Sequence, residues 1–217
     1  MQRRDFLAMS SLASLAALVP AQNLARTQEN HMRKLMVFNQ VSLDGYFTDR
    51  AGDMSWAHRR DPEWMKFQSE NAGGDAELVF GRITYEMMAS FWPTPQARET
   101  MPQVADAMNR MRKSVFSRTL EHATWQNTRV MKGDLVTEVH RMKAEPGPDL
   151  VMMGSGQIIA QLTQAQLIDE YQIVVTNTVL GSGRTMFEGV TSRPGLALTK
   201  TRSFDNGNVV LWYTLAT

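Results

Sequence analysis

The stretch LVMMGSGQII, residues 150–159, passes from an apolar segment through two glycines into helical sequence. Four consecutive apolar residues bounded by glycine predict a buried parallel strand over residues 150–153. Helical periodicity follows over residues 158–167, so the glycines mark a strand-to-helix junction. Glycine lets the backbone come close to a ligand, and free N–H groups at a helix start favour an anion such as a pyrophosphate. A Gly-x-Gly turn is also an ordinary connection between a strand and a helix, so both interpretations stay open.

Two further junctions of the same kind carry side chains that suit phosphate. In FGRITYE, residues 80–86, a strand ends at Gly81, and Arg82 and Thr84 open a helix with a guanidinium and a hydroxyl. In VFSRTL, residues 115–120, a strand ends in Ser-Arg-Thr. The alternatives are a capped helix for the first and a solvated turn for the second. In parallel sheets ligands bind outside the carboxyl ends of the strands, so three such junctions together favour a nucleotide site.

The remaining sequence alternates strands and helices. Strands are expected over residues 34–43, 77–80, 113–116, 124–131 and 171–180. Helices are expected over residues 61–71, 82–90, 102–110 and 134–143, with Pro93 and Pro95 enforcing a loop. Residues 196–203 and 209–215 form a closing hairpin around Asp205-Asn206-Gly207. This order predicts an α/β fold with a mostly parallel central sheet, an antiparallel C-terminal edge and helices on both faces.

The first residues differ in composition from the rest. Arg3 and Arg4 precede an apolar, uncharged run over residues 8–19, which is shorter than the roughly 20 residues of a membrane helix. We therefore expect a cleavable twin-arginine signal over residues 1–21, a linker over residues 22–32 and one domain over residues 33–217. The protein would then be periplasmic, with no stable membrane anchor. Translation from Met32 would instead give a cytoplasmic protein.

Composition excludes several classes of function. The chain has 217 residues, with 23 basic against 22 acidic, so no net field attracts nucleic acid. It contains no cysteine, which excludes disulfides and thiolate metal ligands. The four histidines, His31, His58, His122 and His140, show no ligand spacing, so we expect no metal site.

A set of short motifs resembles one family in order and spacing. The motifs are SLDG (residues 42–45), Trp56, GRITYE (81–86), SRTL (117–120), GSG (154–156), LIDEY (167–171) and LGSGRTMF (180–187). Over residues 33–215 the chain resembles the dihydrofolate reductase-like family that includes the C-terminal reductase domain of bifunctional riboflavin-biosynthesis enzymes. The resemblance implies a three-layer dihydrofolate reductase-like fold, NADPH as cofactor and a homodimer.

The resemblance also implies which residues bind the cofactor. It places Gly81, Arg82 and Thr84 near the phosphates, and Ser117, Arg118 and Thr119 near the ribose 2′-phosphate. It places Gly154, Ser155, Gly156 and Gln157 at the pyrophosphate.

Three residues are candidates for contact with the substrate. Asp44 ends the first strand, where a carboxylate would accept a hydrogen bond or relay a proton, making it the candidate catalytic residue. The alternative is a turn aspartate that bonds its own backbone. Tyr46 and Trp56 are candidates to stack on an aromatic substrate, with core packing as the alternative.

These inferences predict an NADPH-dependent reductase of a small heteroaromatic or carbonyl substrate. The reaction would be similar to the 5-amino-6-(5-phosphoribosylamino)uracil reductase step or to dihydrofolate reduction. A zinc deaminase domain with cysteine ligands is excluded, because the chain has no cysteine. The alternatives are a non-catalytic module that binds a nucleotide or metabolite in the same cleft, and a purely structural exported domain.

Overall fold

One mixed sheet forms the centre of the computed structural model, which describes residues 32–58 and 61–216. Its eight strands lie in the order β5-β4-β3-β6-β1-β7-β10-β9. Their bounds are β1 Leu35–Ser42, β3 Glu77–Gly81, β4 Arg112–Phe116, β5 Thr128–Met131, β6 Leu150–Met153, β7 Glu170–Thr176, β9 Leu196–Ser203 and β10 Val209–Leu215. Every pairing from β5 to β7 is parallel, whereas β10 pairs antiparallel with both β7 and β9. The prediction of a mostly parallel sheet with an antiparallel C-terminal edge is confirmed.

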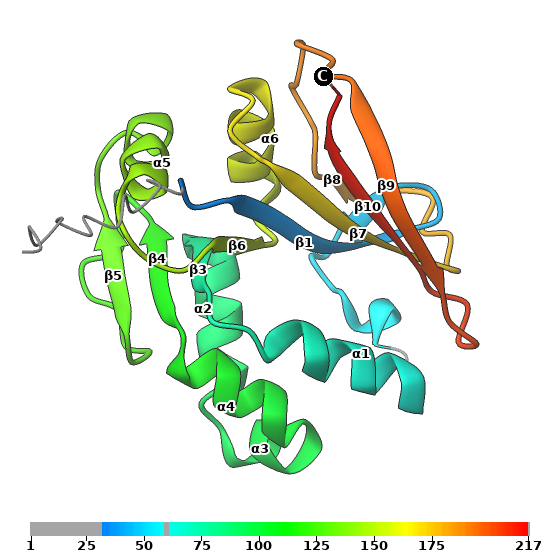
Figure 1. The fold of residues 1–217 in the computed structure, drawn as a ribbon. Coiled ribbons are helices and arrows are strands. Elements are labelled where there is room, and N and C mark those ends of the chain that lie inside the picture. The colour runs from blue at the N-terminus through cyan, green and yellow to red at the C-terminus, as the bar shows by residue number, and fades with distance from the viewer. Residues whose placement is uncertain (1–31, 59–60, 217) are drawn as a thin grey trace, which may run out of the picture. The chain divides into compact units, whose positions relative to one another are not determined.

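Helices cover both faces of this sheet (Figure 1). They are α1 Pro62–Ala72, α2 Arg82–Phe91, α3 Pro95–Thr100, α4 Pro102–Arg110, α5 Leu135–Ala144 and α6 Gly156–Gln164. Apolar residues of α5 and α6 pack with β1, β6 and β7 on one face. Residues of α2 and α4 pack with β3 and β4 on the other face, and α1 packs there against β7 and β10. The result is the three-layer α/β arrangement that the sequence predicted.

Helix starts follow local capping chemistry. The side chain of Asp61 accepts a hydrogen bond from the backbone N–H of Trp64 at 2.8 Å, and Pro62 occupies the first turn. Asp134 accepts from the N–H of Thr137 at 2.9 Å in the same way. Both starts agree with the sequence prediction. Pro95, by contrast, opens α3 instead of enforcing a loop, because proline is well tolerated in the first helical turn.

Three elements have boundaries that differ from the prediction by two residues or more. β5 begins at Thr128 instead of residue 124, because Asn127 is left-handed (φ 59°) and breaks the extended chain. β7 ends at Thr176, four residues before the expected end at residue 180. α6 spans residues 156–164 instead of 158–167, so its first turn lies immediately after the GSG junction.

Three short elements beside the first strand were not predicted. β2 (Tyr46–Thr48) pairs antiparallel with β8 (Arg184–Thr185), and the 3₁₀ helix η1 (Ser55–Ala57) follows β2. Segments of two or three residues carry too little periodicity to be recognised in a sequence. The β2–β8 pair places two distant parts of the chain beside the start of α6.

The outer strand β9 is exposed along nearly its whole length. The Lys200 ammonium lies 4.7 Å from the centre of the Trp212 ring. Arg202 forms an ion pair with Glu63 of α1 at 2.8 Å. At the other side of the sheet, the edge strand β5 has only four residues.

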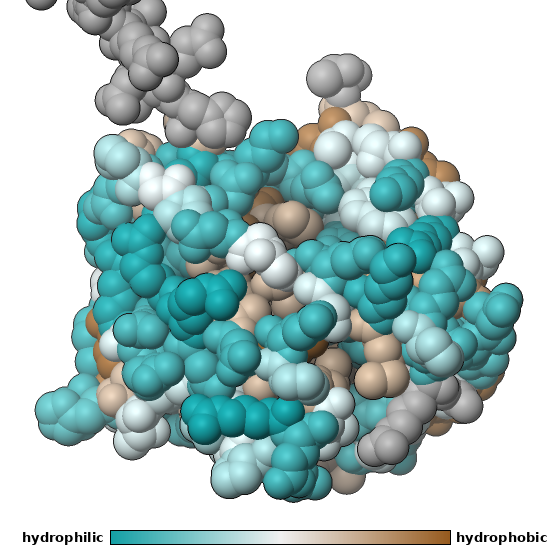
Figure 2. Space-filling model, turned by 60° about the horizontal axis from the view of Figure 1, so that its bottom comes forward, coloured by the Kyte–Doolittle hydropathy of each residue, from teal (hydrophilic) through white to brown (hydrophobic). Residues whose placement is uncertain are grey.

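Figure 2 turns the lower side of Figure 1 forward and shows a mainly hydrophilic surface with small, separate apolar patches. No helix in the described part of the chain is long and apolar enough to cross a membrane. The proposed signal and linker, residues 1–21 and 22–32, lie outside the described residues except for Met32.

Candidate functional site

The three phosphate-type junctions lie at one edge of the sheet. Strands β4, β3 and β6 are neighbours and run parallel, so their carboxyl ends point the same way. Ser117, Gly81 and Gly154 stand at or directly after these ends. The end of β1, which leads to Asp44, is the next position along the same edge. The structure therefore brings together the junctions that the sequence marked separately.

Two of the junctions are joined by direct hydrogen bonds through Ser155. The backbone N–H of Gly81 donates to Ser155 Oγ at 2.9 Å. Ser155 Oγ in turn donates to Thr84 Oγ1 at 2.8 Å, and Thr84 is buried. The start of α2 and the start of α6 are thus held in a fixed relation. We call Gly81, Thr84 and Ser155 the junction cluster.

The glycines of these junctions are required by the packing of the protein itself. A Cβ on Gly81 would lie 2.6 Å from Ser155 Oγ, and one on Gly156 would lie 2.8 Å from Phe47 Cε1. Gly154 has a φ of +73°, which favours glycine, and a Cβ there would lie 3.1 Å from Thr84 Cγ2. From the sequence, these glycines are predicted to allow close approach to a ligand. The structure shows close approach between neighbouring elements, and the ligand role stays a prediction.

Both helix starts at this edge lack a side-chain cap within the described residues. Ser155 precedes α6 with a left-handed φ of 67°, and its hydroxyl bonds the other junction instead of the helix. Gly81 precedes α2 and has no side chain to act as a cap. The first amide groups of a helix have no partner within the helix and carry its positive dipole end. These two starts are therefore favourable places for an anion, with Gln157 exposed on the first turn of α6.

Arg82 lies on the first turn of α2 and is exposed. Its guanidinium forms an ion pair with Glu86 one turn later, with the two closest atoms 2.8 Å apart. An exposed pair of this kind contributes little free energy. The Arg82 guanidinium can therefore leave Glu86 and bind a phosphate with little loss of free energy.

The third junction is a tight turn. Ser117 Oγ accepts hydrogen bonds from the N–H groups of Thr119, at 3.2 Å, and Leu120, at 2.9 Å. This is the solvated turn that the sequence left open as the alternative to a phosphate site. Arg118 is exposed, and no described residue pairs with its guanidinium. Arg118 and Thr119 remain accessible at the edge, and their role toward a phosphate stays a prediction.

Asp44 is tied into the loop that follows β7. Its Oδ1 accepts from Ser42 Oγ at 2.6 Å and from the N–H of Leu180 at 3.1 Å, and its Oδ2 accepts from Gly181 at 2.7 Å. The hydrogen bond from Ser42 is the main cause that holds the pKa of Asp44 below its usual value, and the two backbone bonds add to it. Asp44 is thus a carboxylate at neutral pH that joins two loops. Its proposed role as a proton relay stays a prediction.

The aromatic candidates lie on elements that begin just beyond β1. Tyr46 opens β2 opposite Thr185, and Trp56 lies in η1, where its Nε1 donates to the carbonyl of Asp53 at 3.1 Å. Both side chains are half-buried and belong to none of the buried core clusters of the described residues. Sequence reasoning missed Phe47, which packs against Gly156, because no local pattern connects residue 47 with residue 156.

Within the described residues there is no group of three or more His, Asp or Glu side chains placed to hold a metal ion. A cavity of about 500 Å³ lies at the opposite edge of the sheet, where strands β3, β4 and β5 begin. It is separate from the junction cluster.

The fold and this edge together define a protein of the dihydrofolate reductase-like α/β class. A putative riboflavin biosynthesis protein from Shewanella sp. PV-4 superimposes with a TM-score of 0.65 at 23% identity, over 85% of this chain and 99% of the other. Dihydrofolate reductase from Enterococcus faecalis, in complex with NADP(H), superimposes with a TM-score of 0.59 at 16% identity, over 85% and 97%. At these identities the likeness establishes the fold.

This chain belongs to the RibD C-terminal domain family, whose model matches residues 33–210. It is also similar to the uncharacterized protein YyaP of Bacillus subtilis, with 27% identity over 187 residues, which are 86% of this chain and 97% of the relative. The family suggested by the short motifs is confirmed. It is a reductase-type family.

Proposed function

We propose that this protein is an NADPH-dependent reductase that acts on a small heteroaromatic or carbonyl compound. The observation that carries the proposal is the convergence of the three junctions at the carboxyl edge of β4, β3 and β6, with two of them joined through Ser155. Family membership supports a reductase. The edge supports a ligand with several phosphate groups.

The donor groups at this edge fit NADPH. The uncapped starts of α2 and α6 offer backbone N–H groups to a pyrophosphate. Arg82 and Arg118 are exposed cations at the edge, suited to the remaining phosphate charge. When bound, NADPH would supply the hydride, and the residues of the chain would bind and orient it.

The substrate would lie beside the end of β1. There the Asp44 carboxylate is ionised and oriented by Ser42, so it would act first as a hydrogen-bond acceptor. Tyr46 and Trp56 would contribute aromatic surface, since both are partly exposed and follow β1 in the chain.

Titration of the purified protein with NADPH tests the cofactor site. We expect a Kd in the low micromolar range, about −8 kcal/mol, and a loss of about tenfold or more for Arg82→Ala, since a bond to a charged group contributes roughly 1.5–3 kcal/mol. Arg98→Ala on α3 is the matched control, because it removes one basic side chain that lies elsewhere. Unchanged affinity in Arg82→Ala would count against this site.

A non-catalytic binding module is the second candidate. It is favoured by the bonds of Asp44, because both carboxylate oxygens are already held by the chain. Loss of NADPH absorbance in the presence of pterins, pyrimidines and quinones separates the two functions. Oxidation with any one class of compound supports the reductase, and tight binding without oxidation supports the module.

Export and self-association belong to the same proposal. We propose that a twin-arginine signal over residues 1–21 directs the protein to the periplasm and that the mature protein is a homodimer. Mass spectrometry of protein from its native host would give the mature N-terminus, expected after Ala21, and any dinucleotide that copurifies. An N-terminus at Met32 would refute export by this signal, and a monomer in sedimentation velocity would refute the dimer.

A further inference from the structure

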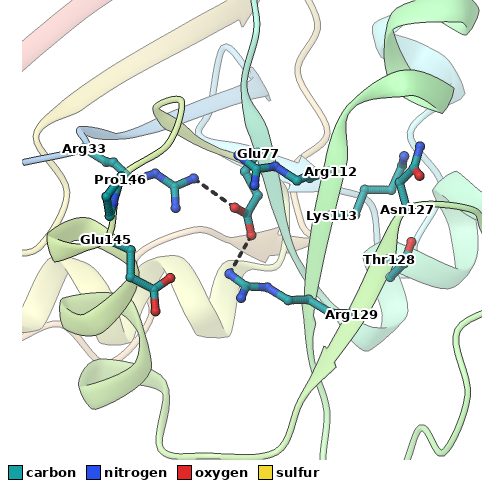
Figure 3. Close-up of a pocket in the computed structure, with 9 residues that line it drawn as sticks. All are labelled: Arg33, Glu77, Arg112, Lys113, Asn127, Thr128, Arg129, Glu145 and Pro146. Atoms are coloured by element: carbon teal, nitrogen blue, oxygen red, sulfur yellow. Dashed lines mark hydrogen bonds and ion pairs between the residues drawn. The ribbon is translucent and has the colours of Figure 1, made fainter.

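A charged cavity lies at the amino edge of the sheet, opposite the junction cluster. It has a volume of about 500 Å³. The residues that line it come from the starts of β3, β4 and β5, from the segment before β1 and from the end of α5: Arg33, Glu77, Arg112, Lys113, Asn127, Thr128, Arg129, Glu145 and Pro146. Figure 3 shows three arginine side chains around the carboxylate of Glu77.

Glu77 is a buried anion at the centre of this cavity. Its Oε2 forms an ion pair with Arg33 at 2.9 Å, and its Oε1 pairs with Arg129 at 2.9 Å and accepts from Ser114 Oγ at 2.6 Å. Burial alone would raise the pKa of Glu77, but the hydrogen bonds from Ser114 and Arg33, together with the charges of Arg129 and Arg33, outweigh it and lower the pKa below its usual value. Glu77 is therefore charged at neutral pH, and its acceptor capacity is used by the protein.

The basic groups of the cavity are not all satisfied in this way. Arg33 is buried and donates to Glu77 and to the carbonyls of Met142 and Pro148. Arg129 uses Nε and one Nη, and its side chain is 43% exposed, so the second Nη faces no described acceptor.

Arg112 is exposed, and its guanidinium has no hydrogen bond or ion pair within the described residues. It nevertheless lies close to another cation. A Cβ on Gly147 would lie 3.3 Å from an Arg112 Nη and 3.3 Å from Arg33 Cζ. Two guanidinium groups thus approach the same point at Gly147, which follows the lining residue Pro146.

The charges of the lining do not balance. Arg33 and Arg129 share the single carboxylate of Glu77, and the other carboxylate, Glu145, is paired with Arg141 outside the cavity. The Lys113 ammonium is directed elsewhere, since it donates to the carbonyls of Asn109, Met111 and Gln126. The positive charges repel one another, which raises the free energy of the empty cavity. A bound anion would reduce this repulsion and lower the free energy.

We propose that this cavity binds a small oxyanionic metabolite, with its phosphate or carboxylate group held between Arg112 and the free side of Arg129. Planar guanidinium groups match both kinds of anion in bidentate fashion, and the volume is that of a small-molecule site. The site is at the opposite edge from the proposed cofactor site and does not depend on NADPH.

Chemical shifts of the ¹⁵N-labelled full chain, titrated without NADPH at constant ionic strength, test the proposal. The probes are inorganic phosphate and malonate, balanced with sodium chloride. We expect saturable shifts at residues 112–113 and 127–129. Any shifts at residues 81–84 and 154–157 report the separate helix starts and are fitted on their own. Saturation by phosphate alone supports a phosphorylated ligand, and saturation by malonate alone supports a carboxylate. Saturation by both supports an oxyanion site that accepts either group.

Arg112→Gln and Arg129→Gln should each raise the Kd about tenfold, the size of one charge-assisted hydrogen bond. Arg110→Gln is the matched control, because Arg110 is an exposed cation at the end of α4 that does not line the cavity. Arg112 has no partner to lose within the described residues, so its variant keeps the fold even if that of Arg129 does not. Shifts that never saturate, or an equal loss of affinity in Arg110→Gln, would overturn the proposal.

Discussion

Removing the hydroxyl of Ser155 should uncouple the two halves of the candidate cofactor edge. Ser155→Ala loses the bond from the buried N–H of Gly81 and the bond to Thr84 Oγ1. A buried donor left without a partner costs roughly 1–3 kcal/mol, and a second bond about 1 kcal/mol. We therefore expect the free energy of unfolding to fall by about 2–4 kcal/mol, a large part of the usual stability of a single domain.

Two further variants make this prediction specific. Ser155→Gly loses the same bonds but relieves the left-handed backbone (φ 67°), so it should be about 1 kcal/mol more stable than Ser155→Ala. Thr84→Val removes the other hydroxyl, and the double variant with Ser155→Ala should show a coupling energy of about 1 kcal/mol. Urea denaturation measures all of these values. If the two substitutions are additive within about 0.3 kcal/mol, Ser155 and Thr84 are not coupled through their hydroxyl groups and this part of the reasoning is refuted.

Other perturbations test the packing and the buried charges. Glu77→Gln leaves the buried Arg33 without a counter-charge and should lower the free energy of unfolding by roughly 3–5 kcal/mol in urea; a loss below about 1 kcal/mol would contradict the buried ion-pair network. Burial lowers the pKa of Lys113 from 10.5 to about 8, so the unfolded chain binds more protons between these values and stability should rise with pH across that window. Relative to Lys113→Met, the free energy of unfolding of the wild-type protein should rise by on the order of 2 kcal/mol between pH 7.5 and pH 9.5. No rise, or a fall, would show that the Lys113 ammonium is not desolvated. Gly156→Ala places a Cβ 2.8 Å from Phe47 Cε1 and should cost roughly 1–3 kcal/mol in thermal or urea unfolding; its control, Gly74→Ala, meets no atom within 4 Å and should be close to neutral, so equal effects would argue against the close contact.

Much of the fold follows from short-range signals in the sequence. The apolar run at residues 150–153 predicts a strand because its side chains are suited to burial. Asp61-Pro62 predicts a helix start because aspartate caps the helix and proline fits its first turn. The shared edge of Ser117, Gly81 and Gly154 also follows, because parallel neighbouring strands end on the same side.

The contacts that complete the site could not be predicted in this way. Ser155 meets Gly81 across 74 positions of sequence, and Phe47 meets Gly156 across an even greater separation. Glu77 lies 44 positions from Arg33 and 52 from Arg129, so no local pattern indicates that they form one buried network. Such pairs depend on strand order, which periodicity does not determine.

The two outermost strands of the sheet bear on solubility. An open edge exposes backbone groups that invite pairing with another chain, and long apolar edges promote aggregation. Here β5 is only four residues long, and β9 carries the long basic side chains Lys200 and Arg202, a type of residue that blunts the edges of natural sheets. We expect substitution of both basic residues by valine to leave the domain folded but prone to fibrillar association at high concentration.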